Sequence, residues 1–136
     1  MCSSDLSGIK SPADFKGKKI GNWGFGNEFE VFAGITKAGL DPAADVELVQ
    51  QQFDMTGLLN KEIDAAEAMT YNEYAQLLET KNPDTGKLYT PEDFSAISYE
   101  AEGVGMLQDA IWANEEKLAS DAAYQDLTQR FVQASL

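Results

Sequence analysis

The sequence contains no histidine, and its single cysteine, Cys2, lies close to the amino terminus. Histidine is the commonest general base and metal ligand in proteins, so its absence disfavours most acid–base catalysis and most metal sites. One cysteine can form neither a disulfide nor a cysteine-based metal cluster within the chain. We therefore expect no metal and no cofactor held through histidine or cysteine.

Basic residues and long apolar runs are scarce as well. The chain carries 10 Lys and Arg against 23 Asp and Glu, a net charge of -13. Nucleic acids and anionic lipids are bound through clustered Lys and Arg, so neither is an expected partner. No apolar run is long enough to cross a bilayer, and the basic-then-apolar start of a secretory signal is missing. These absences predict a soluble chain without a targeting signal.

The length of 136 residues, 43% of them hydrophobic, suffices for one folded domain. Met1–Leu6 is what the end of a common short-read sequencing adapter would encode, so we interpret residues 1–6 as a non-native scar. The alternative is a mature lipoprotein, in which a lipidated Cys2 precedes small polar residues. At the other end the expected helix reaches Leu136 without a Gly or Pro stop, which predicts that the native chain continues.

Strands and helices alternate between residues 11 and 80. Ser11-Pro12-Ala13-Asp14 is typical of a helix start, with Ser as the N-cap and Pro at the first helical position. Strands are predicted at Lys19–Trp23, Val46–Gln51 and Ile63–Met69, and helices at Asn27–Ala38, Met55–Glu62 and Asn72–Thr80. This alternation with short connections predicts an α/β fold, a mostly parallel sheet with helices on both faces.

The pattern changes after residue 80. Lys81–Phe94 reads as a long polar loop, because it combines Asn-Pro-Asp, Gly and Thr-Pro turn signals. Two further strands are predicted at Ala96–Tyr99 and Val104–Ala113, followed by a helix at Asn114–Leu136.

Two of the predicted strand-to-helix junctions carry aromatic, amide and acidic side chains. Because the carboxyl ends of parallel strands meet at one edge of a sheet, we expect the two junctions to form two walls of one pocket. The candidate ligand-binding residues are Trp23, Gly24, Gly26, Asn27, Glu28, Tyr71, Asn72 and Glu73. The two rings are expected to stack on a planar ligand, and the Asn and Glu side chains to supply hydrogen bonds. The glycines allow the ligand to approach the backbone closely.

Each of these motifs also has a structural interpretation. Trp23 could pack into the core, and the two glycines could form only a tight turn. Thr70 and Glu73 match a capping box in which Glu73 accepts a hydrogen bond from the Thr70 amide. Acids such as Glu28 are favoured in a first helical turn by the helix dipole. A dinucleotide fingerprint is disfavoured, because its third glycine position holds Phe29.

The positions of Lys and Arg in the sequence limit the chemical class of ligand that we expect. Arg130 is the sole arginine and lies on the terminal helix, and no lysine falls within 22–31 or 65–78. A sulfonate, phosphate or carboxylate is usually met by a bidentate arginine. Acids, amides and rings instead suit a neutral or amino-bearing heteroaromatic whose N–H groups donate to Glu. An anion held by helix N-terminal amides alone remains the alternative.

Several motifs occur in an order that is typical of one protein family. They are Ser11–Ile20, Gly39–Pro42, Ile63–Ala65, Met69–Tyr74, Gly103–Ala113, Asn114–Leu118 and Arg130–Leu136. In this order the chain resembles the substrate-binding proteins of ABC transporters related to the thiamine-pyrimidine-precursor family, which also contains aliphatic sulfonate receptors. Such receptors are two-lobed type II periplasmic binding proteins that close on their ligand.

The resemblance implies a division of the chain into parts of that fold. Residues 7–103 would form the ligand-binding lobe. Residues 104–136 would form an antiparallel hinge strand and a helix returning toward a missing lobe. One lobe supplies half of a cleft, so the isolated chain is expected to bind its ligand weakly.

The implied function is extracytoplasmic or periplasmic capture of a pyrimidine-like thiamine precursor, or a related small heterocycle. The implied partner is the membrane permease of an ABC importer, and the complete protein would be a monomer. One alternative is the effector domain of a LysR-type regulator, which shares the two-lobed fold. Another is a pyrimidine-synthesis enzyme. The eukaryotic enzymes use a histidine and a cysteine-rich segment, whereas this chain has no histidine and carries Gly103–Leu107 in place of the cysteines, so we expect that it is not an enzyme.

Overall fold

The computed structural model describes residues 2–4, 8–107 and 110–135. The chain forms two compact units, Met1–Met106 and Leu107–Leu136. The first unit contains the sheet and the second contains two helices, and each is described by itself.

A sheet with the strand order β3-β2-β4-β1-β5 forms the centre of the first unit. The strands are β1 (Cys2–Ser4), β2 (Lys19–Asn22), β3 (Glu47–Gln50), β4 (Ala65–Ala66) and β5 (Phe94–Ala96). β2 pairs in parallel with both β3 and β4, whereas β1 is antiparallel to β4 and to β5. The predicted α/β class is therefore confirmed: three parallel strands flanked by helices, consistent with one lobe of the two-lobed fold.

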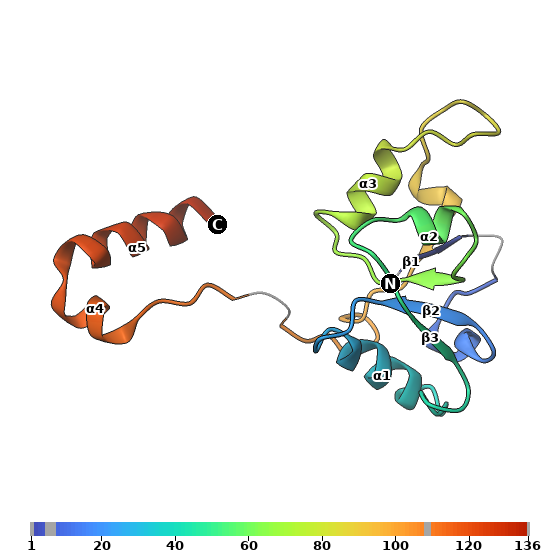
Figure 1. The fold of residues 1–136 in the computed structure, drawn as a ribbon, viewed down its shortest axis with the longest axis horizontal. Coiled ribbons are helices and arrows are strands. Elements are labelled where there is room, and N and C mark those ends of the chain that lie inside the picture. Colours follow the sequence, from blue (N-terminus) through green and yellow to red (C-terminus); the bar gives the residue numbers. More distant parts are fainter. Residues whose placement is uncertain (1, 5–7, 108–109, 136) are drawn as a thin grey trace. The chain divides into compact units, whose positions relative to one another are not determined.

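Helices cover both faces of this sheet (Figure 1). They are η2 (Pro12–Phe15), α1 (Glu28–Lys37), α2 (Thr56–Leu59), α3 (Glu73–Glu79) and η3 (Pro91–Asp93). At the start of η2, the Asp14 carboxylate accepts the amides of Lys10 and Ser11 at 3.0 and 2.9 Å, as the sequence predicts for a helix start. α1 ends where the Ala38 amide bonds back to Gly34 and Gly39 adopts a positive φ of 81°.

The core consists of two apolar clusters, one on each side of the sheet. Ile20, Val31 and Ile35 belong to the cluster under α1, and Met55, Leu58 and Leu77 to the cluster under α2 and α3. The two residues of β4 divide between them, because successive side chains of a strand point to opposite faces. Their sequence, Ala65-Ala66, is apolar without alternation, which is typical of a parallel strand buried on both faces.

The strand predicted at Val104–Ala113 is not present in the described residues of that segment, 104–107 and 110–113. Gly103 has a positive φ of 69° and ends a turn in which the Val104 amide bonds to the Tyr99 carbonyl, so the chain bends away from an extended path. The strand predicted at Ala96–Tyr99 is found earlier, as β5. The antiparallel neighbour of β4 and β5 is instead β1.

β1 lies within the segment that the sequence analysis sets aside as a scar. Its pairs join Cys2 to Ala66 and Ala96, and Ser4 to Phe94. Pairing of this kind uses the backbone N–H and C=O groups, and every residue except proline supplies both. The pairing of β1 therefore does not test whether residues 1–6 are native, and the scar interpretation stays a prediction.

The second unit contains α4 (Glu115–Ser120) and α5 (Ala122–Ser135). The sequence predicts one helix from Asn114 to Leu136, of which Leu136 lies outside the described residues. The break occurs at Asp121, which is extended and whose side chain accepts the amides of Ala123 and Tyr124. In the part of the chain that the structure describes, no helix is both long and apolar enough to cross a membrane.

Candidate functional site

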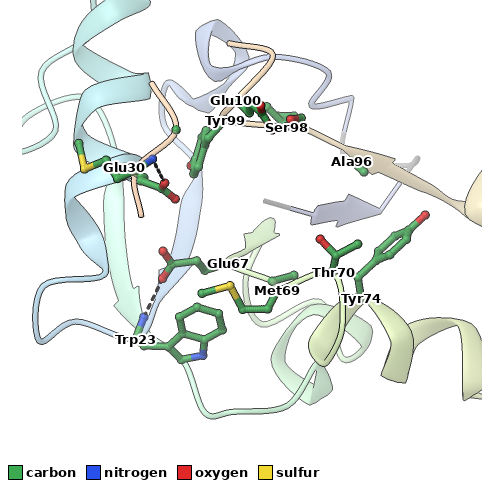
Figure 2. Close-up of a pocket in the computed structure, with 14 residues that line it drawn as sticks. Trp23, Glu30, Glu67, Met69, Thr70, Tyr74, Ala96, Ser98, Tyr99 and Glu100 are labelled. Atoms are coloured by element: carbon green, nitrogen blue, oxygen red, sulfur yellow. Dashed lines mark hydrogen bonds between the residues drawn. The ribbon is translucent and has the colours of Figure 1, made fainter. Parts of the chain in front are cut away.

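A cavity of about 400 Å³ opens beyond the carboxyl ends of β2 and β4 in the first unit (Figure 2). Its lining comes from the turn after β2, from α1, from the loop between β4 and α3, and from the chain after β5. The lining residues are Trp23, Glu30, Glu67, Ala68, Met69, Thr70, Tyr74, Ala96, Ile97, Ser98, Tyr99, Glu100, Gly105 and Met106. This is the position at which open α/β sheets bind ligands, and the volume suits a single-ring molecule.

Glu67 is the acid at the base of the cavity, directly after β4. It is 5% exposed, and its Oε2 accepts the backbone amide of Trp23 at 3.1 Å. Gln51 holds the Glu67 backbone on both sides, accepting its amide and donating to its carbonyl, each at 2.8 Å. Burial raises the pKa of the Glu67 carboxyl from its ordinary value of 4.5 to about 7, because desolvation disfavours the charged form.

Two further polar groups face Glu67 across the cavity (Figure 2). The Tyr99 side chain is 8% exposed, and within the described residues its hydroxyl has no hydrogen-bond partner. Burial raises the pKa of Tyr99 above its ordinary range, and the charges of Glu67 and Glu30 raise it further. The Glu30 carboxylate, from the first turn of α1, accepts the backbone amide of Met106. We name Glu30, Glu67 and Tyr99 the acidic cluster.

The apolar part of the cavity includes Trp23, Met69 and Ile97. The Trp23 ring is 4% exposed, stacks on Phe53 at 5.9 Å between ring centroids, and donates from Nε1 to the Gln52 carbonyl at 3.3 Å. Trp23 is therefore buried, as the structural interpretation expects, and it also lines the cavity. Its stacking on a ligand stays a prediction.

The rest of the first predicted junction forms the turn between β2 and α1. Gly24 and Gly26 have positive φ angles of 72° and 105°, which explains the need for glycine there. The Asn27 side chain donates to the Gly24 carbonyl at 3.1 Å, and the Glu28 carboxylate accepts the Gly26 amide at 2.8 Å. These four residues follow Trp23 closely in the sequence, but they are not among the residues that line the cavity.

The second predicted junction differs from the capping box expected for it. Glu73 is 2% exposed, and its carboxylate accepts the amide of Met69, not that of Thr70, at 3.0 Å. The helix begins one residue after Asn72, whose side chain donates to Glu73 at 2.8 Å. The prediction of Thr70 as N-cap is wrong, because the Glu73 carboxylate reaches one residue further back. Tyr71 and Asn72 are exposed outside the cavity lining.

The two junctions nonetheless line one cavity, as expected, but mostly through residues other than the predicted ones. Trp23 comes from the first junction, and Met69, Thr70 and Tyr74 come from the second, and all four line the same cavity. The residues that the sequence analysis missed are those of the acidic cluster. Glu67 could have been identified from the sequence, because it is an acid that directly follows the apolar pair Ala65-Ala66. Tyr99 and Glu30 carry no such signal, because only folding brings them to the cavity.

Comparison with known families gives one finding. The model of the family described as NMT1/THI5 like matches residues 1–136. Neither the curated proteins nor the solved structures contain a significant match.

Proposed function

Because the chain belongs to the NMT1/THI5-like family, we propose that it captures a pyrimidine-like thiamine precursor, or a related small heterocycle, for an ABC importer. The family comprises substrate-binding proteins of aliphatic sulfonate and thiamine precursor transporters, so solute binding in import is the role that it supports. The heterocycle is the more specific part of the proposal, and it depends on the chemistry of the cavity.

The partners and location follow from the same family. Its substrate-binding members bind small molecules outside the cytoplasm and deliver them to an ABC permease, and most members are binding proteins and not enzymes. We propose the same for this chain: an extracytoplasmic or periplasmic protein that acts as a monomer when complete, without catalysis, metal or cofactor.

The observation that carries the choice of ligand is the composition of the cavity wall. The lining contains two aromatic rings besides Trp23, three acids and no Lys or Arg. A sulfonate would be left without a cationic partner there, and Glu30 and Glu67 would repel it. A planar ring with N–H groups can instead stack on apolar side chains and donate to the carboxylates.

We propose that the junction residues outside the cavity lining contact the ligand from the rim of the cavity. Tyr71 is the clearest case, because its ring is 73% exposed and lies two residues before the buried Glu73. Gly24, Gly26, Asn27, Glu28 and Asn72 are proposed to approach the ligand in the same way. Tyr71→Ala is expected to lower ligand affinity without lowering the free energy of unfolding, since an exposed ring adds little to stability.

The test is thermal stabilisation of the 136-residue chain by a panel of small molecules. A ligand at a hundred times its dissociation constant stabilises the folded state by about 2.7 kcal/mol. We expect stabilisation by aminopyrimidines and none by aliphatic sulfonates. Stabilisation by sulfonates alone would overturn the ligand assignment while leaving the transport role of the family in place.

A further inference from the structure

We propose that the acidic cluster binds a protonated amidine-like group of the ligand. In this group two adjacent N–H groups share one positive charge, and a single flat ring carries the group. The proposal rests on the proposed function and deepens it, because it names the chemical class of the ligand and the residues that select it. None of the three residues belongs to the predicted junction site.

The first support is the Tyr99 hydroxyl. It is buried against the cavity, and within the described chain it has no hydrogen-bond partner. A buried hydroxyl without a partner loses the hydrogen bonds that water offers it in the unfolded chain. A ligand N–H that donates to Tyr99 Oη would restore such a bond. Glu67 and Tyr99 line the same cavity and face one another across it (Figure 2), so a ligand in the cavity lies between the two groups.

The second support is the charge of the wall. Glu30 and Glu67 approach the cavity from different elements, α1 and the end of β4, and no cationic side chain among the lining residues neutralises them. Two like charges in a desolvated site disfavour each other, and a ligand cation between them removes that cost. The structure holds both carboxylates in place, because Glu67 accepts the Trp23 amide and Glu30 accepts the Met106 amide.

The third support is shape. An amidinium is planar and presents two parallel N–H donors to a carboxylate, which is the geometry of the strongest charge-assisted pairs. Trp23, Met69 and Ile97 supply an apolar wall for a ring attached to that group, and about 400 Å³ accommodates one ring. A compact ammonium would satisfy the acids but would leave this wall without contact.

The test uses three ligands with the same phenyl ring and different charge: benzamidine and benzamide, whose polar groups are both planar, and the anion benzenesulfonate. Binding to the ¹⁵N-labelled chain is followed by NMR through the backbone amide of Trp23, which donates to Glu67 and so reports on its carboxylate. At about pH 8 we expect benzamidine to bind at least about tenfold more tightly than benzamide, and benzenesulfonate not to bind.

Two variants and one control assign the effect to the cluster. Glu67→Gln is expected to abolish the preference for benzamidine over benzamide, and Tyr99→Phe to weaken benzamidine about three- to tenfold. Glu47→Gln removes an exposed acid at the start of β3 and is expected to leave both affinities unchanged. Equal benzamidine affinity in the wild-type and Glu67→Gln chains would overturn the proposal, as would equal binding of benzamidine and benzamide.

A parallel titration with 4-amino-2-methylpyrimidine separates this proposal from the proposed function. If this compound binds wild type and Glu67→Gln equally, the subsite is wrong and the function stands. If benzamidine shows the expected preference but no pyrimidine binds, the subsite stands and the pyrimidine-like ligand is wrong. Because half of a cleft is expected to bind weakly, each titration extends to millimolar ligand, and if none of these compounds binds even there, both proposals fail.

Discussion

Replacing Glu67 by Gln is expected to stabilise the protein in a way that depends on pH. Glutamine has nearly the shape of the protonated acid, and its Oε1 can still accept the Trp23 amide. The folded state raises the pKa of Glu67 from 4.5 to about 7, so it favours the protonated form. Its contribution to stability is therefore complete below pH 4.5 and is lost progressively as the pH rises to about 7.

The magnitude follows from the interval between these two pKa values. At ~1.4 kcal/mol for each pH unit, ionising buried Glu67 costs about 3 kcal/mol near pH 8 and less than about 1 kcal/mol near pH 5. Gln carries no such cost at either pH. The stability advantage of Glu67→Gln over wild type should therefore grow by about 2 to 3 kcal/mol between the two conditions.

The assay is urea unfolding followed by tryptophan fluorescence, in a Trp112→Phe background that leaves Trp23 as the reporter. Comparing each variant with wild type at the same pH cancels other ionisations. Those of Asp14 and Asp45 lie below the window, because backbone amides hydrogen-bonded to each carboxylate lower its pKa. The reasoning is refuted if the difference between Glu67→Gln and wild type is the same at both pH values, or if it shrinks as the pH rises.

Three further outcomes are expected. The NMR chemical shift of the Trp23 amide proton should change with pH with a midpoint near pH 7 in wild type, and it should not show this change in Glu67→Gln. A midpoint near pH 4.5 in wild type would contradict the argument that burial raises the pKa of Glu67. Tyr99→Phe should leave the free energy of unfolding unchanged or raise it by up to about 1 kcal/mol, since it removes a hydroxyl without a partner in the described chain; a loss above that would mean that the hydroxyl is bonded. Gly21→Ala should cost about 1 to 3 kcal/mol in urea unfolding, because its methyl would lie 2.6 Å from two side chains, whereas Gly57→Ala, with 3.6 Å to its nearest neighbour, should be tolerated.

The part of the fold that was predictable depends on local patterns. The helix start at Ser11–Asp14 and the helix after Asn27 were predictable, because caps and apolar spacing act within a few residues along the chain. The strand predicted at Val104–Ala113 is absent from the described residues of that segment, 104–107 and 110–113. Strand pairing depends on contacts that are distant in the chain, and the antiparallel position between β4 and β5 is taken by β1.

The candidate site was also predictable only in part. The sequence was sufficient to predict that the carboxyl ends of β2 and β4 meet, and Trp23 lies in the cavity there. It was not sufficient for the acids, because Glu28 and Glu73 are equally plausible from sequence alone. In the structure both accept nearby backbone amides and lie outside the cavity lining, whereas the acids of the lining are Glu30, Glu67 and Glu100.

The sequence by itself determined the α/β class and membership of the family, and within these 136 residues it supplies no histidine and no pair of cysteines for a disulfide. These properties follow from composition, from periodicity and from the order of short motifs, none of which requires distant contacts. Only the tertiary structure decided which polar groups are desolvated together. Glu67 and Tyr99 are far apart in the chain, and burial raises the pKa of each because both line a cavity that forms when α1, β4 and the segment after β5 pack around it.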